Sequence, residues 1–155
     1  MVGGRIPKPA VLLSVERPSA MRIPRRELIE LVEFVGLVEG AGLAQVDLAV
    51  VGSLRMADLN RRYLRHRGPT DVLSFDLSEQ DRTRICAQLI ICADVAVRQA
   101  KRYGTSARRE LLLYVVHGLL HLLGYDDSTS AGSARMRQRQ EQILRDFLRR
   151  RRCPK

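Results

Sequence analysis

The stretch of residues 106–123 is apolar on nearly every side of a helix, and this feature limits most strongly what the chain can fold into. Its leucines and valines point in almost every direction around the axis: Leu111, Leu112, Leu113, Val115, Val116, Leu119, Leu120, Leu122 and Leu123. A helix that is apolar all round is a buried one. We therefore expect the other elements of the chain to surround it.

Shorter periodic segments supply those elements. Apolar and alternating runs predict four strands, at residues 11–15, 45–51, 72–77 and 89–93. Helical spacing predicts further helices, one that begins at Pro24, one over residues 94–103 that stops at Gly104, and one over about 133–150. Neither repeats nor a long linker interrupt the chain. We therefore expect residues 1–155 to form one domain, whose motifs lie within about 45–127 and whose basic C-terminal helix covers about 133–152.

One more helix is predicted between the second and third strands. Ser53 is placed to cap its N-terminus, because a serine side chain accepts a hydrogen bond from a free amide of the first turn. The residues expected on one face of this helix are Met56, Leu59, Asn60 and Tyr63.

The charge of the chain favours a polyanionic partner. Lysine and arginine number 27 against 17 acidic residues, which leaves a formal net charge of +10. A field of this sign attracts nucleic acid. The three cysteines, Cys86, Cys92 and Cys153, have neither the number nor the spacing of a disulfide framework or a thiolate zinc site, so a reducing, cytoplasmic setting is expected. No apolar run reaches the roughly 18 residues of a membrane span.

Two histidines on the buried helix predict a metal site. His117 and His121 are four residues apart, so both imidazoles project from the same face, about one turn from each other. Gly124 stands where a left-handed C′ residue is expected, and the turn it makes can return Asp127 to the same ion. The pattern H-x-x-x-H-x-x-G-x-x-D has the ligand spacing of the metzincins. Asp126 is the alternative third ligand, and two structural histidines hydrogen-bonded within the core are the alternative to a metal.

Three protein ligands leave one position of a tetrahedral zinc ion open to water, which is typical of catalytic sites. Water bound to zinc can reach a pKa of about 7 and attack a phosphodiester. A peptidase of the zincin type carries its general base directly after the first histidine. That position is Gly118 here, which disfavours peptide hydrolysis.

Three segments resemble the YbeY family of bacterial metallo-endoribonucleases. Residues 117–126 match the family's signature H-G-x-L-H-L-x-G-Y-D-H throughout, and only its last histidine is replaced, by Asp127. Residues 59–63 are similar to the family's L-N-x-x-Y segment and residues 69–75 to its P-T-D-V-L-S-F segment. Residues 91–96 are similar to its strand-to-helix junction. By motif position the family's three metal-binding histidines fall on His117, His121 and Asp127.

The resemblance implies an α+β fold, in which a small mixed four-stranded sheet packs with about five helices and a zincin-like helix binds the metal. It implies a metal-dependent endoribonuclease that hydrolyses phosphodiester bonds in single-stranded RNA. The ligand set itself predicts one zinc ion per chain, and the oxygen ligand of Asp127 also suits another divalent metal such as manganese. The family's role is maturation of the 3′ end of the small-subunit (16S) ribosomal RNA and ribosome quality control. The small ribosomal subunit is therefore the expected partner, and neither DNA nor a membrane is.

Four arginines are candidates to contact RNA: Arg61, Arg62, Arg65 and Arg67. Arg65 is the candidate catalytic arginine among them, although the family's usual arginine stands one place earlier, where this chain has Leu64. The alternative for all four is a solvated basic loop. Two other functions stay open: a ribosome-associated RNA-binding or assembly factor with a structural metal, and, less favoured, a metalloprotease.

Overall fold

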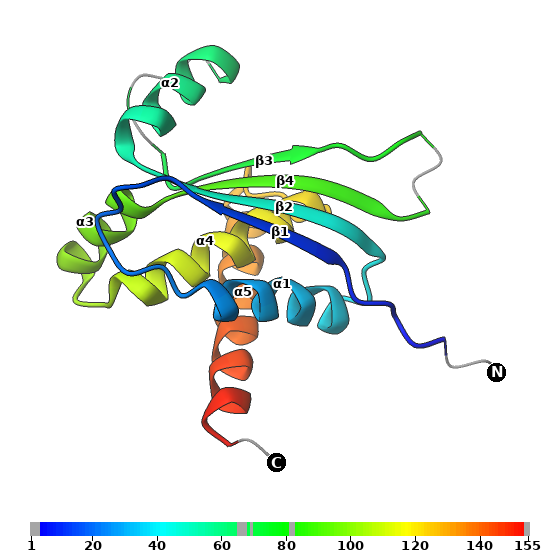
Figure 1. Ribbon diagram of the computed structural model, residues 1–155. Coiled ribbons are helices and arrows are strands. Elements are labelled where there is room, and N and C mark those ends of the chain that lie inside the picture. Colours follow the sequence, from blue (N-terminus) through cyan, green and yellow to red (C-terminus); the bar gives the residue numbers. More distant parts are fainter. Residues whose placement is uncertain (1–3, 65–67, 69, 81–82, 154–155) are drawn as a thin grey trace.

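The computed structural model describes residues 4–64, 68, 70–80 and 83–153, and Figure 1 shows their arrangement. The order of elements is β1 (Ala10–Val15), α1 (Arg25–Val38), β2 (Leu43–Val51), α2 (Ser53–Tyr63), β3 (Val72–Asp76), β4 (Ile85–Cys92), α3 (Ala93–Tyr103), α4 (Ala107–Leu122) and α5 (Ser130–Arg152). The expected α+β architecture of four strands and five helices is confirmed.

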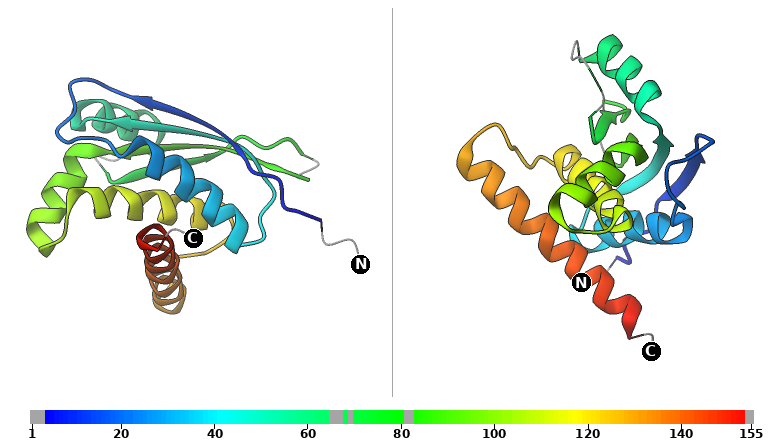
Figure 2. Two further views of the ribbon diagram at one scale, coloured as in Figure 1. Left: turned by 60° about the horizontal axis from the view of Figure 1, so that its bottom comes forward. Right: turned by 90° about the vertical axis from the view of Figure 1, so that its left-hand side faces the viewer.

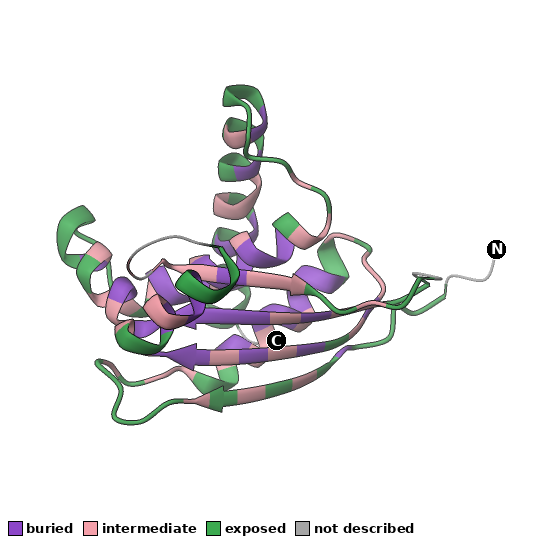
Figure 3. Cartoon of the chain, turned by 90° about the horizontal axis from the view of Figure 1, so that it is seen from above, coloured by how far each residue is buried: buried purple, intermediate pink, exposed green. Residues whose placement is uncertain are grey.

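The sheet is mixed, with strand order β1-β2-β4-β3. β1, β2 and β4 run parallel, while β3 pairs antiparallel with β4. Figure 1 shows α1, α4 and α5 on one side of the sheet and α2 on the other. Figure 3 shows that buried residues concentrate in β2 and β4, toward the carboxyl ends of both strands. The core therefore lies between these two strands and the helices beneath them.

Helix α4 is the buried centre of the helical layer, as its sequence predicts. Contacts join it to α1, α3 and α5 on its sides and to β3 and β4 above. Leu111, Leu112, Val115, Leu119 and Leu120 are all fully buried. Figure 2 shows α5 as a long helix that runs across this layer at an angle and projects beyond it. None of the described helices is both long and apolar enough to cross a membrane.

The predicted cap of α2 is wrong. Gly52 is the N-cap residue and Ser53 is the first residue of the helix, so the serine side chain does not cap it. The backbone N–H of Ser53 instead donates to Oδ2 of Asp94, at 2.6 Å, from the first turn of α3. A carboxylate distant in sequence thus replaces the local serine, and it stabilises the positive end of the helix more strongly.

The largest differences from the predicted boundaries are at the starts of β4 and α5, and one packing position also differs. β4 begins at Ile85 rather than at residue 89, because its first half pairs with β2. α5 begins at Ser130 rather than at residue 133, because Oγ1 of Thr129 accepts from the N–H of Gly132, at 3.0 Å. Tyr63 is mostly exposed, and its ring meets the ring of Phe75 edge-on rather than joining the core.

Candidate functional site

The end of α4 sets the position of the candidate ligands. Ser106 caps the start of the helix by accepting from the N–H of Arg109, at 3.1 Å. At the other end Gly124 has a φ of +100°, in the left-handed region that favours glycine. The N–H of Tyr125 donates to the carbonyl of Leu120 (3.1 Å) and that of Gly124 to the carbonyl of His121 (3.2 Å). These two bonds form a Schellman motif, which reverses the chain after the second histidine.

Tyr125 fixes the reversed segment to two other helices. Its hydroxyl donates to Oε2 of Glu39, at 3.0 Å, at the end of α1. Oε1 of the same carboxylate accepts from Nε of Arg139 in α5, at 2.6 Å. Burial, together with the hydrogen bond to Glu39, raises the pKa of Tyr125, so the phenol keeps its proton as a donor. The turn that carries Asp127 is therefore held by side chains from α1 and α5.

His117 has a different partner on each ring nitrogen. Its Nδ1 lies 3.0 Å from Oε1 of Gln140 in α5, and its Nε2 lies 3.7 Å from Oδ2 of Asp127. An amide oxygen can only accept, so the proton belongs on Nδ1. In the neutral imidazole the lone pair of Nε2 then faces Asp127. A ring oriented in this way by a hydrogen bond from its other nitrogen is typical of a metal-binding histidine.

Asp126 and Asp127 differ in what their carboxylates already bind. Oδ1 of Asp126 accepts from the N–H of Ser128, and Oδ2 accepts from the serine hydroxyl, both at 2.8 Å. These hydrogen bonds lower the pKa of Asp126. Asp126 therefore stabilises its own turn, whereas Asp127 faces His117. This geometry favours Asp127 over Asp126 as the third ligand.

His121 is exposed one helical turn beyond His117. Across residues 4–64, 68, 70–80 and 83–153, no three His, Cys, Asp or Glu side chains converge closely enough to hold a metal ion. The structure thus brings His117 and Asp127 together, and the predicted set of three ligands stays a prediction.

Gly118 allows α4 to lie unusually close to the sheet. A Cβ atom at this position would stand 2.7 Å from Cδ2 of Leu89, 2.9 Å from Oγ of Ser74 and 3.0 Å from Cγ2 of Val72. The hydroxyl of Ser74 also donates to the carbonyl of Gly118, at 3.2 Å. Any side chain at this position would enter the contact between α4 and strands β3 and β4. The position that carries the general base in zincin peptidases therefore has no room for a glutamate.

A small polar cavity of about 230 Å³ lies beside His117. It is lined by residues of β3, α3, α4 and α5 or next to them: Asp71, Gln99, Tyr103, Glu110, Leu113, Tyr114, His117 and Gln140. Among the described side chains, the Tyr114 hydroxyl and Oε1 of Gln99 are buried without a hydrogen-bond partner. Burial, and then the nearby charge of Glu110, raises the pKa of Tyr114. The neutral phenol of Tyr114 therefore lines the same cavity as His117, the first candidate ligand.

The structure describes two of the four candidate RNA-binding arginines. Arg61 and Arg62 are exposed on α2, and both lie against the carboxylate of Asp58, at 2.8 and 3.2 Å. Arg65 and Arg67 lie outside the described residues. The buried side chain of Asn60 donates to the carbonyl of Gly68, at 2.7 Å, and so connects Gly68 to α2.

Comparison with known proteins identifies the family of this chain. The family model described as Endoribonuclease YbeY matches residues 17–148. The chain belongs to this family. It is 46% identical to the endoribonuclease YbeY of Moorella thermoacetica over 67% of this chain and 73% of that protein. It is 35% identical to that of Salinibacter ruber over 88% of this chain and 92% of that protein.

The fold is also similar to a solved one. The solution structure of TM1509 from Thermotoga maritima superposes with a TM-score of 0.62 at 24% identity, and the match covers 92% of this chain and 91% of that one.

The sequence alone does not identify several residues that position the candidate site, among them Glu39, Gln140 and Gly132. Each acts on a residue distant in sequence or through the space it leaves free, so no local pattern marks it.

Proposed function

We propose that the chain is a metal-dependent endoribonuclease that hydrolyses single-stranded RNA, with His117, His121 and Asp127 as the ligands of one zinc ion. The observation that carries the proposal is the orientation of His117, whose Nε2 faces Oδ2 of Asp127 at 3.7 Å while Gln140 holds Nδ1. Membership of the YbeY family supports an RNA substrate. The net charge of +10 supports it independently.

The donor set fits such an ion. Two imidazoles and one carboxylate are ordinary zinc ligands, and three of them leave a position open to water. A bound zinc would lower the pKa of that water to about 7 and polarise a phosphoryl oxygen. The carboxylate of Asp127 adds a negative charge that a third histidine would lack, and an oxygen donor also suits manganese. The protein's own part is to orient the ligands through Gln140, Tyr125 and the Schellman turn.

The proposed substrate within the cell is the 3′ end of the small-subunit ribosomal RNA, with the small ribosomal subunit in the cytoplasm as partner. The family name is consistent with this role. An RNA-binding assembly factor with a structural metal is the competing proposal, because the site contains no identified general base. A metalloprotease is disfavoured by the lack of space at Gly118.

The enzyme and the assembly factor make different predictions for His121→Ala. The residue is exposed, so its replacement leaves the core intact. If the chain is a metal-dependent nuclease, cleavage of a labelled single-stranded RNA falls at least about a hundredfold while the Kd for the same RNA changes little. Gel-based cleavage and fluorescence anisotropy measure the two quantities. Undiminished cleavage in a variant that has lost its metal would rule out the metal-dependent reaction.

The two neighbouring aspartates provide a matched test of the third ligand. Asp127→Ala is expected to lose stoichiometric zinc, as measured by plasma mass spectrometry of protein purified after zinc loading. Asp126→Ala is expected to retain zinc, because the Asp126 carboxylate is engaged by Ser128 rather than directed at His117. Zinc that is lost from the Asp126 variant and kept in the Asp127 variant would reverse the assignment.

A further inference from the structure

A second cluster of positive charge lies where the loop between β1 and α1 meets α1, α4 and α5. The cleft there has a volume of about 780 Å³. Six arginines and one carboxylate line it: Arg17, Arg22, Arg25, Arg26, Arg108, Arg151 and Glu27. We call it the arginine cleft. Arginine presents a planar fork that matches phosphate oxygens, so its density here points to a phosphate-bearing ligand.

Half of these arginines are held in place by glutamates. Arg108 donates from both Nε and Nη2 to the two carboxylate oxygens of Glu27, and this pairing lowers the pKa of the carboxyl. Nε of Arg151 lies 3.7 Å from Glu27, and its Nη1 contacts Glu30. Glu30 also accepts from Nε of Arg26, at 2.7 Å. Two carboxylates thus orient three arginines without neutralising all of them.

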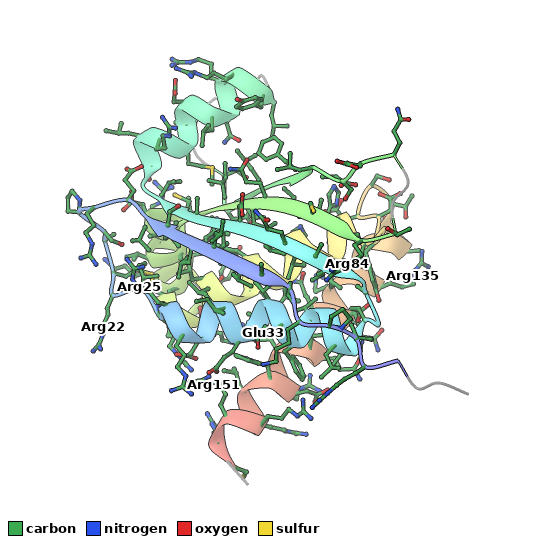
Figure 4. The ribbon with its side chains drawn as sticks, turned by 45° about the vertical axis from the view of Figure 1, so that its right-hand side comes forward. Arg22, Arg25, Glu33, Arg84, Arg135 and Arg151 are labelled. Atoms are coloured by element: carbon green, nitrogen blue, oxygen red, sulfur yellow. The ribbon has the colours of Figure 1, made fainter. Side chains whose placement is uncertain are left out.

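The other three arginines are exposed and carry uncompensated charge. No ion pair within the described part of the chain engages Arg17, Arg22 or Arg25. Figure 4 shows Arg22 and Arg25 at the same end of the molecule, with Arg151 below them. At the N-terminus of α1, Pro24 makes no side-chain cap, and the acidic residue of the first turn, Glu27, is paired with Arg108.

We propose that the arginine cleft binds the sugar-phosphate backbone of a single-stranded RNA at a distance from the metal site. This inference rests on the proposed function, which supplies the RNA. The cleft is larger than one phosphate, and its arginines come from three helices and a loop, so it suits a chain of phosphates better than a single anion. Val15, Met21 and Ile23 add partly buried apolar surface to the lining, against which the apolar surface of an unpaired base can be removed from water.

The cleft is separate from the candidate metal site. Arg108 and His117 lie nine residues apart on α4, which corresponds to about two and a half turns, or about 13 Å along the axis. Their side chains therefore project from opposite sides of the helix. An RNA that reaches both sites must run around the helical layer. The arginine cleft thus holds a flanking segment of the RNA rather than the bond that is cleaved.

The double variant Arg22→Glu/Arg25→Glu tests the cleft. Both side chains are exposed and unpaired among the described residues, so the fold is expected to survive, which circular dichroism checks. Binding of a long labelled single-stranded RNA to the metal-free protein is measured by anisotropy over a range of salt concentrations. We expect roughly tenfold weaker binding at low salt, and a slope of log Kd against log salt that is smaller by about 1.4, at about 0.7 for each of two phosphates lost.

The control is Arg84→Glu/Arg145→Glu, which changes the net charge equally at exposed residues outside the cleft. Arg84 donates to the carbonyl of Leu43, at 3.3 Å, so circular dichroism checks the fold of the control as well. Figure 4 places Arg84 at the other end of the molecule from Arg22 and Arg25. The control is expected to bind long RNA nearly as the unmodified protein does. A short RNA that spans only the metal site should bind the cleft variant and the unmodified protein equally.

Three results would overturn the proposal. Equal weakening in the cleft variant and the control would mean that only net charge matters. Unchanged binding of long RNA by the cleft variant would mean that the arginines form a solvated face. If the cleft variant keeps its RNA binding but loses binding to vesicles of anionic lipid, the cleft belongs to a membrane surface. Cleavage at saturating RNA is measured separately with zinc-loaded protein. If the unmodified protein fails to cleave, the nuclease proposal fails, while the binding comparison still decides on the cleft.

Discussion

Gly132→Ala is expected to destabilise the protein by about 2 kcal/mol or more and to displace the turn that carries Asp127. A Cβ at this position would stand 2.1 Å from the carbonyl oxygen of Asp126 and 2.9 Å from Oγ1 of Thr129. The first of these atoms belongs to the backbone, so no rotamer change can relieve the overlap. The segment from Asp126 to Thr129 must move away from α5, and Asp127 moves with it.

Helix propensity alone predicts the opposite sign for this substitution. Alanine is favoured over glycine inside a helix by about 1 kcal/mol, and residue 132 lies in the first turn of α5. The overlap must exceed this gain for a net loss to appear, and a backbone contact far below 3 Å does so. Urea denaturation gives the free energy of unfolding, and zinc titration gives the effect on the site. Ser133→Ala, one position along, is the control. Greater stability of the alanine variant at position 132 would show that the turn can adapt.

The sequence predicts the centre of this fold because α4 carries its own signal. Apolar residues in every direction mark it as buried, and Gly124 marks its end, since both signals are local. The same holds for the strands, whose existence follows from short apolar runs. The boundaries of the strands do not follow from these runs, because the first half of β4 becomes a strand only through its pairing with β2.

The same difference between local and distant interactions holds for the candidate site. The spacing of His117 and His121 and the turn after Leu123 follow from the sequence. The partners that orient them do not: Gln140 follows His117 by 23 residues, and Glu39 precedes Tyr125 by 86. The cap of α2 illustrates the general reason. The sequence predicts a local serine as the cap, yet the distant Asp94 takes its place because the tertiary fold brings a stronger acceptor to the helix end.

Gly118→Glu is expected to prevent stable folding, although it would give the chain the histidine-glutamate pair of a zincin peptidase. The side chain would enter the contact of α4 with β3 and β4, where its Cβ alone would stand 2.7 Å from Leu89. Beyond the overlap, a carboxylate would be buried without a partner, which costs several kcal/mol or forces its protonation. Insoluble or molten protein, judged by near-ultraviolet circular dichroism and denaturant titration, is the expected outcome.

Gly118→Ala measures the steric part of this effect on a protein that still folds. Overpacking of a close contact costs about 1–3 kcal/mol, from which roughly 1 kcal/mol of helix propensity is regained. Because a Cβ at position 118 would touch Leu89, the two substitutions are expected to be energetically coupled. In a double-mutant cycle, Leu89→Val should lessen the cost of Gly118→Ala by at least about 0.5 kcal/mol. Strict additivity of the two changes would mean that Leu89 is not the contact that limits residue 118. A stable, folded Gly118→Glu variant would remove the steric reason for excluding a peptidase, because α4 could then stand further from the sheet than the space at Gly118 implies.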